Sequence, residues 1–382
     1  MKRRVCWILT IVLILGLLPL HAGAVELNVE GKSAFLMDVA TGTVLYEKNA
    51  HEMLAPASVT KVMTMLLIME AIDSGKIGWN DTVTASETAA AKGGSQIYLK
   101  AGEEMSVTDM VKSIAVSSAN DCACAMAEHL AGSESAFVEQ MNARAKALGM
   151  TDTYFVNCTG LDDDPAAKEH LTSAHDIAVM SRELLKNHPD IKKYTTIWMD
   201  TVRGGAFGLS NTNKLVRFYN GATGLKTGFT SAAGYCLSAS AQRDGMELIA
   251  VIMGCETSQQ RFAACKSMLD YGFANYALVN PQRPENAAVP VKLGKADQIA
   301  AVPAQEGALL IDKAQLNQVN IQTVLEESVT APVSKGQRLG TMTIRAGEQI
   351  LTQIPLVAET GVERLGFFDI FLRVLRQLSM AA

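Results

Sequence analysis

The chain has 382 residues, with 34 basic and 39 acidic side chains and a formal net charge of −5 at pH 7. This length exceeds what one hydrophobic core usually holds, so we expect two domains. No stripe of basic residues runs along the chain, which argues against nucleic acid as a partner. Internal repeats and low-complexity tracts are also missing from the sequence, so a repeat architecture is excluded.

Residues 1–24 have the three parts of a secretory signal peptide. A basic start (Lys2 to Arg4) precedes an apolar run (residues 5–20) and a small-residue A-x-A site (residues 22–24). Cleavage after Ala24 would remove three basic and no acidic residues, which changes the net charge from −5 to −8 over the remaining 358 residues. The alternative is an uncleaved membrane anchor, because the apolar run approaches spanning length. Either reading predicts an exported protein, periplasmic or extracellular.

The six cysteines outside that segment are even in number but poorly spaced for a disulfide scaffold. Two of them lie two residues apart in a helical stretch and so do not face each other, and others lie in apolar runs, so we expect buried free thiols. The chain has no CxxC motif, and we expect no metal. The six are Cys122, Cys124, Cys158, Cys236, Cys255 and Cys265.

The first half of the chain predicts a hairpin followed by helices. Residues 33–39 and 43–47 are rich in β-branched and aromatic residues and flank a Thr-Gly turn, which is typical of two paired strands. The run from residue 58 to about 72 is almost continuously apolar and begins after a proline, so it predicts a buried helix. Residues 84–188 are mostly helical in pattern, with segments over 107–131 and 134–148.

The pattern changes to strands after Gly224. Residues 234–243 and 246–254 flank Asp244-Gly245, a strong hairpin signal, and a helix is expected from about 258 to 276. We therefore predict an α+β domain over residues 25–280, in which both ends of the chain build one antiparallel sheet around a helical insertion.

Two further segments follow. Residues 281–360 contain short β-branched runs separated by prolines, which predicts a small all-β domain. Residues 361–382 form an amphipathic segment in which Asp369, Arg373, Arg376 and Gln377 share one helical stripe and apolar residues cover the rest. Its aromatic residues predict an interfacial helix at a membrane surface, while docking on its own domain is the alternative.

Ser58-Val59-Thr60-Lys61 places a serine and a lysine one helical turn apart, as a nucleophile and its base. We expect burial, the helix dipole and a second cation from Lys226 to lower the pKa of Lys61, so that its neutral amine accepts the serine proton. A Ser-x-x-Lys sequence is common by itself, and a capped helix start is the structural alternative.

Two downstream motifs complete the set. Ser118 and Asn120 would form the facing wall of a cleft, with the serine passing a proton and the amide holding a substrate peptide group. A helix N-cap is the structural alternative for these two residues. Lys226, Thr227 and Gly228 suit an edge strand, where a cation and a hydroxyl bind a carboxylate and the glycine lets substrate approach the backbone. The backbone N–H groups of Phe229 and Ser58 would make an oxyanion hole.

The ordered motifs resemble those of penicillin-binding proteins and serine β-lactamases. Longer stretches, including APASVTKVMT, VSSANDCACAMAEH and GLKTGFTSAAGYCLSASA, resemble the low-molecular-mass serine D-alanyl-D-alanine carboxypeptidases, particularly those of spore-forming bacteria. The resemblance runs from about residue 32 to the C-terminus. It implies a transpeptidase-like fold, a peptidoglycan substrate ending in D-Ala-D-Ala, acylation by β-lactam antibiotics, no cofactor, and a place at the outer face of the membrane or in the cell wall.

The resemblance also assigns roles. Ser58 is the acylated nucleophile, Lys61 the proton acceptor, Ser118 the proton relay and Asn120 a substrate contact. Lys226 and Thr227 form the carboxylate site, and Arg261 corresponds to the family's arginine near that carboxylate, with an exposed helix arginine as the alternative. Phe229 departs from members that carry histidine there.

The same residues bear on three other activities. A class A β-lactamase needs a glutamate four residues before Asn157, where this chain has Thr153, and it has Ser-Asp-Asn where this chain has Ser118-Ala119-Asn120. Endopeptidase or transpeptidase activity differs from carboxypeptidase activity only in the bond cleaved or the acyl acceptor. A wall-binding scaffold would need none of the four residues Ser58, Lys61, Ser118 and Lys226, so the sequence favours an enzyme.

Overall fold

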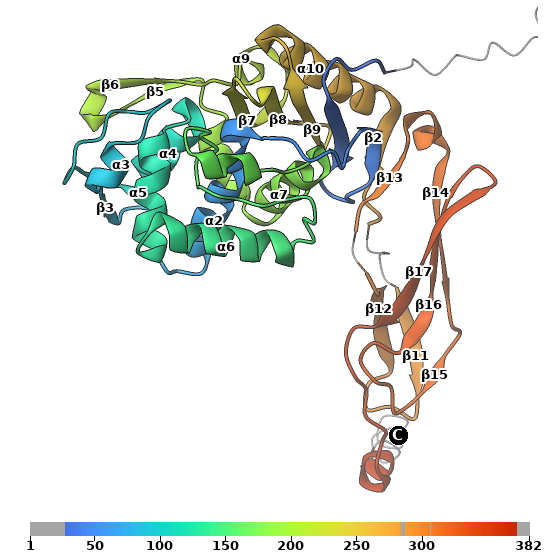
Figure 1. Ribbon diagram of the computed structural model, residues 1–382. Coiled ribbons are helices and arrows are strands. Elements are labelled where there is room, and N and C mark those ends of the chain that lie inside the picture. Colours follow the sequence, from blue (N-terminus) through green and yellow to red (C-terminus); the bar gives the residue numbers. More distant parts are fainter. Residues whose placement is uncertain (1–26, 283, 285–286, 306, 373–382) are drawn as a thin grey trace, which may run out of the picture.

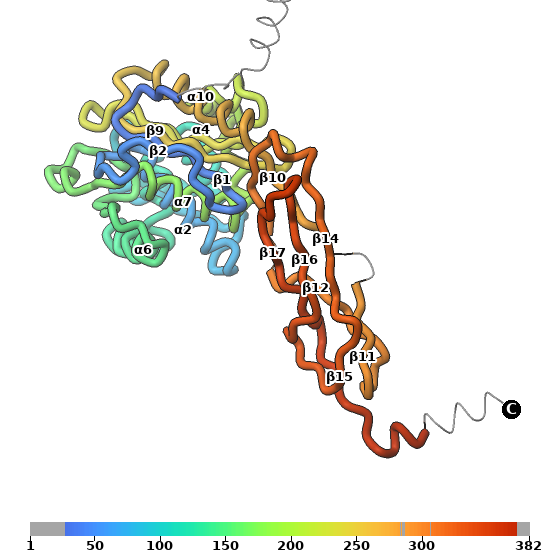
Figure 2. The backbone as a smooth tube through the Cα atoms, turned by 90° about the vertical axis from the view of Figure 1, so that its right-hand side faces the viewer, coloured from blue at the N-terminus to red at the C-terminus, as the bar shows by residue number. Residues whose placement is uncertain are grey.

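The computed structural model describes residues 27–282, 284, 287–305 and 307–372. An N-terminal α+β part is followed by an elongated β-rich part that projects from it, with the last described residues at the far end of the projection (Figure 1; Figure 2). The expected signal peptide over residues 1–24 lies outside the described residues.

One five-stranded antiparallel sheet organises the N-terminal part, in the order β2-β1-β9-β8-β7. Its first two strands come from the start of the chain and the other three from beyond residue 221, so both ends of this part build the sheet, as predicted. The strands are β1 (Ser33–Asp38), β2 (Val44–Lys48), β7 (Ala222–Thr230), β8 (Gly234–Arg243) and β9 (Met246–Cys255).

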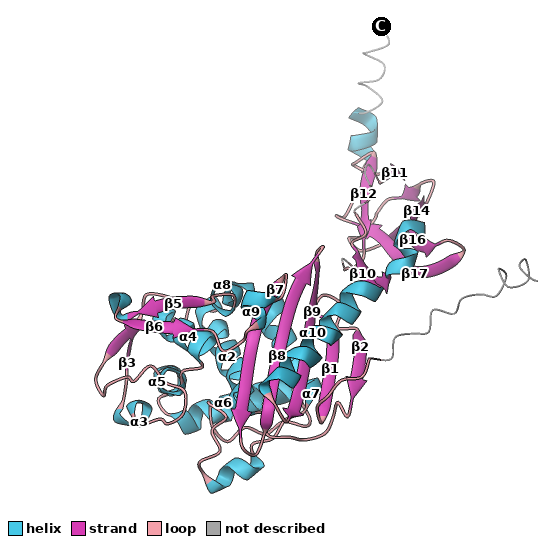
Figure 3. Cartoon of the chain, turned by 90° about the horizontal axis from the view of Figure 1, so that it is seen from above, coloured by secondary structure: helices cyan, strands magenta, loops and turns pink. Residues whose placement is uncertain are grey.

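The central strands are buried on both faces because helices cover both. In β1, Phe35 belongs to the core shared with the helical insertion, while its neighbour Leu36 belongs to the core beneath α10 (Ser258–Asn275). Adjacent strand residues point to opposite faces, which explains the nearly continuous apolar runs. Figure 3 shows α10 lying across one face of the sheet.

The helical insertion begins with the 3₁₀ turn η1 (Ala57–Thr60) and α2 (Lys61–Asp73). It also contains further helices and two small two-stranded sheets, β3 with β4 and β5 with β6. The predicted continuous segment over 107–131 was wrong: the chain breaks at Ser118, whose φ of 63° ends one helix before the next begins at Asn120. The other elements are β3 (Thr82–Thr84), α3 (Glu87–Ala90), β4 (Glu104–Ser106), α4 (Val107–Ser117), α5 (Asn120–Ala131), α6 (Glu134–Ala147), α7 (Ala174–Asn187), α8 (Lys192–Thr195), β5 (Met199–Val202), β6 (Phe207–Ser210), α9 (Leu215–Phe218) and the 3₁₀ turns η2 (Pro165–Glu169), η3 (Pro189–Ile191) and η4 (Arg203–Gly205).

The β-rich part has a six-stranded sheet in the order β14-β16-β17-β12-β11-β15 and a core of its own around Leu339, Met342 and Leu356. A separate pair, β10 with β13, joins the end of the N-terminal part to this region. The elements are β10 (Tyr276–Val279), β11 (Ala288–Lys292), β12 (Gln298–Pro303), β13 (Leu309–Asp312), η5 (Lys313–Gln318), β14 (Val319–Leu325), β15 (Val329–Thr330), β16 (Arg338–Ala346) and β17 (Gln349–Ala358).

Residues 367–372 are helical at the end of the described chain. The rest of the predicted amphipathic helix falls in residues 373–382, outside the described residues. In the part of the chain that the structure covers, no helix is both long enough and apolar enough to span a bilayer. All six cysteines named above are buried and free, as predicted.

Candidate active site

Ser58 lies in the η1 turn, directly before α2, and Lys61 is the first residue of that helix. The Lys61 side chain is fully buried, and its Nζ lies 3.0 Å from Ser58 Oγ and 2.8 Å from the carbonyl oxygen of Thr159. The two residues are therefore in hydrogen-bond contact, with the amine held from behind by a backbone carbonyl.

Burial lowers the pKa of Lys61 to about 7, against smaller opposing effects of Cys158 and Asp121. The repulsion between the two lysines acts on Lys226. Its pKa is held well below its usual range, first by burial and then by the nearby charges of Lys61 and Arg261. A neutral Lys61 has a lone pair that can accept the Ser58 proton near neutral pH.

The carbonyl that binds Lys61 belongs to a tight loop over residues 157–161. The Asn157 side chain holds this loop, since its Oδ1 accepts from the backbone N–H of Gly160 at 2.6 Å and its Nδ2 donates to the carbonyl of Leu161 at 2.9 Å. A Cβ on Gly160, whose φ is +78°, would lie 1.9 Å from the carbonyl oxygen of Ala57. The glycine thus lets the loop pack directly on the nucleophile turn.

The second motif occupies the break between α4 and α5. Ser118 adopts the left-handed conformation, and its buried Oγ has no hydrogen-bond partner among the described residues. Asn120 Nδ2 donates to the carbonyl of Gly93 at 2.7 Å, while its buried Oδ1 also lacks a partner in the described chain. Buried polar atoms are normally satisfied, so these two are suited to receive groups of a bound molecule.

The third motif lies on β7, the edge strand of the sheet, as predicted. The role expected for Gly228 differs from what the structure shows: a Cβ there would lie 2.5 Å from the carbonyl oxygen of Pro56 and 3.1 Å from Val59 N. The glycine therefore allows the strand to pass against the nucleophile turn, which brings the first and third motifs together.

Thr212 links the third motif to the second. Thr227 Oγ1 donates to Thr212 Oγ1 at 2.6 Å, and the Thr212 backbone N–H donates to the carbonyl of Val116 at 3.2 Å, near the end of α4. Sequence analysis missed both Thr212 and Thr159. The polar Asn211-Thr212-Asn213 cluster and the Asn157-x-x-Gly160 spacing are the signals that could have identified them.

Arg261 is buried rather than exposed, so the alternative of an exposed helix arginine was wrong. Its Nη1 donates to the carbonyl of Gly228 at 2.9 Å and its guanidinium lies over the Tyr235 ring. Arg261 thus stabilises β7 through the hydrogen bond to Gly228. Phe229 is 52% exposed and packs on Tyr235 with ring centroids 4.2 Å apart.

His170 has a structural role beside the nucleophile turn. Its Nε2 lies 2.8 Å from Thr60 Oγ1, and its Nδ1 accepts from the Val156 backbone N–H at 3.1 Å. Burial, with a smaller effect of Lys61, lowers the pKa of His170 to about 4, so the ring is neutral at physiological pH.

Comparisons with known proteins agree with this arrangement. A family model described as D-alanyl-D-alanine carboxypeptidase matches residues 21–257, and one described as the C-terminal domain of penicillin-binding protein 5 matches residues 282–364. The D-alanyl-D-alanine carboxypeptidase DacF of Bacillus subtilis is 44% identical over 357 residues, covering 92% of this chain and 90% of the relative.

Solved structures show the same fold. Penicillin-binding protein 5 of Haemophilus influenzae has a TM-score of 0.75 at 29% identity and covers 88% of this chain and 98% of that one. Penicillin-binding protein D2 of Listeria monocytogenes, in its ampicillin-bound form, has a TM-score of 0.59 at 32% identity and covers 65% of this chain and 99% of that one. The chain therefore belongs to the D-alanyl-D-alanine carboxypeptidase family, the serine peptidases of the low-molecular-mass penicillin-binding type.

Proposed function

We propose that the protein removes the terminal D-alanine from peptidoglycan stem peptides through an acyl-enzyme on Ser58. The observation that carries this proposal is the 3.0 Å contact between Lys61 Nζ and Ser58 Oγ, with a pKa of about 7 on the amine. Because both groups are already in contact, the proton of the serine needs no further residue to leave.

The proposed reaction has two steps. Ser58 Oγ forms a bond to the carbonyl carbon between the last two D-alanines while its proton moves to Lys61, and the C–N bond then breaks. The leaving amine takes a proton from Lys61 by way of the Ser118 hydroxyl, and D-alanine departs. Water then attacks the ester carbonyl and gives a proton to Lys61. The bond between the acyl carbon and Ser58 Oγ breaks, Lys61 returns the proton to that oxygen, and the shortened stem peptide leaves.

The remaining motif residues bind the substrate in this proposal. The unpartnered Asn120 Oδ1 accepts a peptide N–H, and Lys226 with Thr227 binds the terminal carboxylate. Arg261 acts through the Gly228 carbonyl and adds positive charge behind the carboxylate site, and the backbone N–H of Phe229 joins that of Ser58 as the oxyanion hole.

The structure offers no support for a class A lactamase. Thr153, at the position where that class has its deacylating glutamate, is engaged elsewhere, with its Oγ1 2.7 Å from Asp176 Oδ2. We therefore expect slow hydrolysis of the acyl-enzyme that penicillin forms on Ser58, because no carboxylate occupies that position to activate water. Carboxypeptidase activity is favoured over endopeptidase or transpeptidase activity because DacF, named a carboxypeptidase, aligns over 90% of its length.

Intact mass spectrometry after mixing with penicillin tests the nucleophile. We expect a long-lived adduct of one penicillin on the wild-type protein and none on Ser58→Ala, together with D-alanine release from a D-Ala-D-Ala peptide by the wild type alone. An adduct that persists on Ser58→Ala would overturn the assignment, and rapid loss of the adduct with destruction of the drug would indicate a lactamase.

We also propose export through residues 1–24 and attachment to a membrane surface through residues 361–382, with residues 25–280 as the catalytic domain and 281–360 as the β domain. Separate cores in the two parts and a run of exposed apolar side chains at the end of the chain support this reading. The exposed residues are Phe367, Phe368, Ile370, Phe371 and Leu372. The catalytic domain would then be displayed at the end of the β domain away from the membrane (Figure 1).

A further inference from the structure

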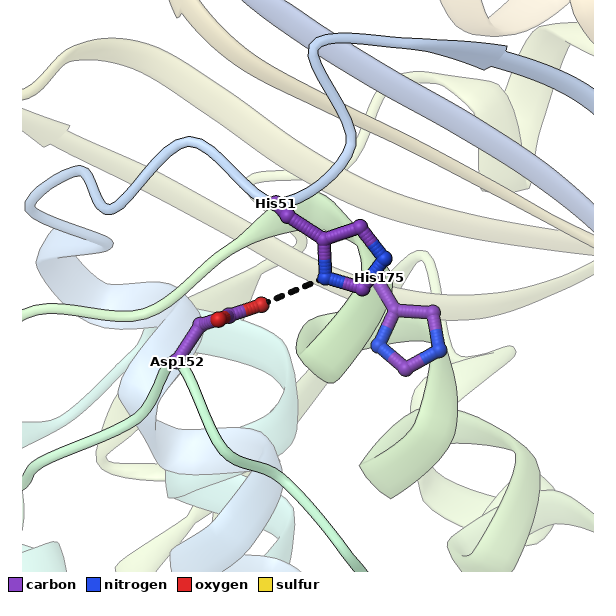
Figure 4. A group of neighbouring side chains, drawn as sticks. All are labelled: His51, Asp152 and His175. Atoms are coloured by element: carbon purple, nitrogen blue, oxygen red, sulfur yellow. Dashed lines mark hydrogen bonds and ion pairs between the residues drawn. The ribbon is translucent and has the colours of Figure 1, made fainter.

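Two histidines and an aspartate meet on the surface of the N-terminal part, in a place that the reaction at Ser58 does not use. His51 lies in the turn after β2, Asp152 in the turn after α6, and His175 in the first turn of α7. One potential ligand atom from each lies within 4.8 Å of those of the other two. Figure 4 shows the His51 ring facing the Asp152 carboxylate, with the His175 ring beside it.

Both imidazoles already have a carboxylate oxygen at Nδ1. His51 Nδ1 lies 2.7 Å from Asp152 Oδ2, His175 Nδ1 lies 2.9 Å from Asp176 Oδ1, and the two ring centroids are 4.6 Å apart. Asp176 is fully buried, and the Asp152 carboxylate lies within ligand distance of both rings. Negative charge therefore exceeds positive charge around two neighbouring rings, which is an environment that favours a cation.

The carboxylates are held in place by neighbours that do not compete for a metal. Ser173 Oγ donates to Asp152 Oδ2 at 2.9 Å, and Asp176 Oδ2 accepts from the backbone N–H of Asp152 at 2.9 Å and from Thr153 Oγ1 at 2.7 Å. Such outer contacts fix ligand orientation and are a regular feature of metal sites in proteins. The cluster thus has both potential ligands and a supporting shell.

A second cluster in the described chain makes a useful contrast. Glu70, Glu183 and His188 also lie within ligand distance of one another, but the Arg144 guanidinium already bridges both carboxylates at 2.6 Å. The Arg144 side chain thus already supplies the positive charge that a metal would bring to that cluster. Across the described residues, the ion pairs of Asp152 and Asp176 are with histidine alone.

We propose that His51, Asp152 and His175 bind a divalent transition metal, Zn²⁺ under ordinary conditions, with water completing the coordination. Imidazole with carboxylate is a ligand set that zinc accepts and that magnesium and calcium do not prefer. His175 would bind through Nε2, because its Nδ1 faces the buried Asp176 carboxylate. The metal takes the place of the proton shared by His51 and Asp152, so binding releases protons.

The proposed metal would connect the segment that leads to Ser58 with α7 of the helical insertion. His51 precedes Ser58 by seven residues, and the intervening Leu54 exchanges two backbone hydrogen bonds with Thr172, just before α7. The backbone N–H of His175 also donates to the carbonyl of Ala50 at 3.0 Å, and a metal that bridges His51 to α7 would add a side-chain link between the same segments. Zinc would therefore stabilise the folded protein without touching Ser58.

Isothermal titration calorimetry of the chelator-treated protein with ZnCl₂, beside thermal unfolding with and without zinc, tests the proposal. We expect one Zn²⁺ per chain, a rise in Tm, and no displacement by excess Mg²⁺. His51→Ala and Asp152→Asn should each weaken binding by about 10-fold or more. His129→Ala, which removes an exposed histidine of α5 outside the cluster, should leave binding unchanged.

The side chain of His51 is 62% exposed, so His51→Ala is expected to fold, and labelling by fluorescent penicillin reports folding in every variant. The proposal would be overturned by zinc binding that His51→Ala and Asp152→Asn leave intact, or by no stoichiometric binding to a protein that still labels. Failure of penicillin labelling with intact zinc binding would instead count against the assignment of Ser58.

Discussion

The two parts of this molecule treat polar side chains in opposite ways. Among the described residues, every buried polar or charged side chain lies in the N-terminal part, including the fully buried Lys61 and Lys226. The β-rich part instead buries apolar side chains at alternating positions of strands such as β16, and none of its charged side chains that the structure describes is fully buried. Burial of a charged group costs free energy unless partners compensate, so the N-terminal part gives up stability where the β-rich part does not.

The atoms that lack partners make the contrast sharper. Of the six buried side-chain atoms without a hydrogen-bond partner in the described structure, five lie in the N-terminal part and only Arg345 Nε lies in the β-rich part. Two of the five, Ser118 Oγ and Asn120 Oδ1, belong to the second motif. A fold optimised for stability would satisfy them. The comparison indicates that the N-terminal part keeps polar groups free for a ligand, whereas the β-rich part has an apolar core suited to a structural role.

The largest expected effect comes from Lys61→Ala. Removing the base should slow acylation by penicillin roughly 10²- to 10⁴-fold, while the Tm stays the same or rises because a desolvated amine is removed. Stopped-flow acylation and calorimetry measure the two quantities, with Lys335→Ala, an exposed lysine of the β-rich part, as control. A large fall in Tm would show that Lys61 is there for stability instead.

Matched glycine substitutions compare the two parts directly. Gly160→Ala places a Cβ 1.9 Å from the Ala57 carbonyl oxygen, whereas Gly336 in the β-rich part has a similar φ of +83° and nothing within 4 Å. We expect Gly160→Ala to cost at least about 3 kcal/mol of unfolding free energy and Gly336→Ala about 1–2 kcal/mol. Urea unfolding measures both, and equal costs would remove the argument for close packing at the nucleophile turn.

The pH dependence of acylation should follow Lys61. The folded pKa of about 7 lies below the usual value of 10.5, so the neutral amine is lost as pH falls through 7. The acylation rate should therefore decline about tenfold per pH unit below 7 and level off above it. His170, with a pKa of about 4, stays neutral over this range. A rate that is flat between pH 5 and 8 would contradict Lys61 as the base.

The smallest effect on catalysis is expected from the far end of the β-rich part. Replacing Phe367, Phe368 and Phe371 together with serine removes three exposed rings and should abolish sedimentation of the full-length protein with anionic lipid vesicles. Acylation by penicillin should be unchanged, because these residues lie far along the projection from the motifs (Figure 1). Retained vesicle binding would assign attachment to another segment.

The sequence by itself determined the class of the fold and the three motifs. The hairpin around Asp244-Gly245, the long apolar run after Ser58 and the one-turn spacing of Ser58 and Lys61 are local patterns, and local patterns reflect the backbone geometry of a few adjacent residues. The edge position of β7 and the free state of the cysteines were predicted on the same kind of evidence.

Only the tertiary structure decided which residues complete the site. The Thr159 carbonyl behind Lys61, Thr212 beside Thr227, and the purpose of Gly228 all depend on contacts between segments 15 to about 170 residues apart. The break at Ser118 had a local signal, since Ser118-Ala119-Asn120-Asp121 is typical of a helix start. Burial sets the pKa of Lys61, and burial is a property of the assembled fold that no single stretch of sequence contains.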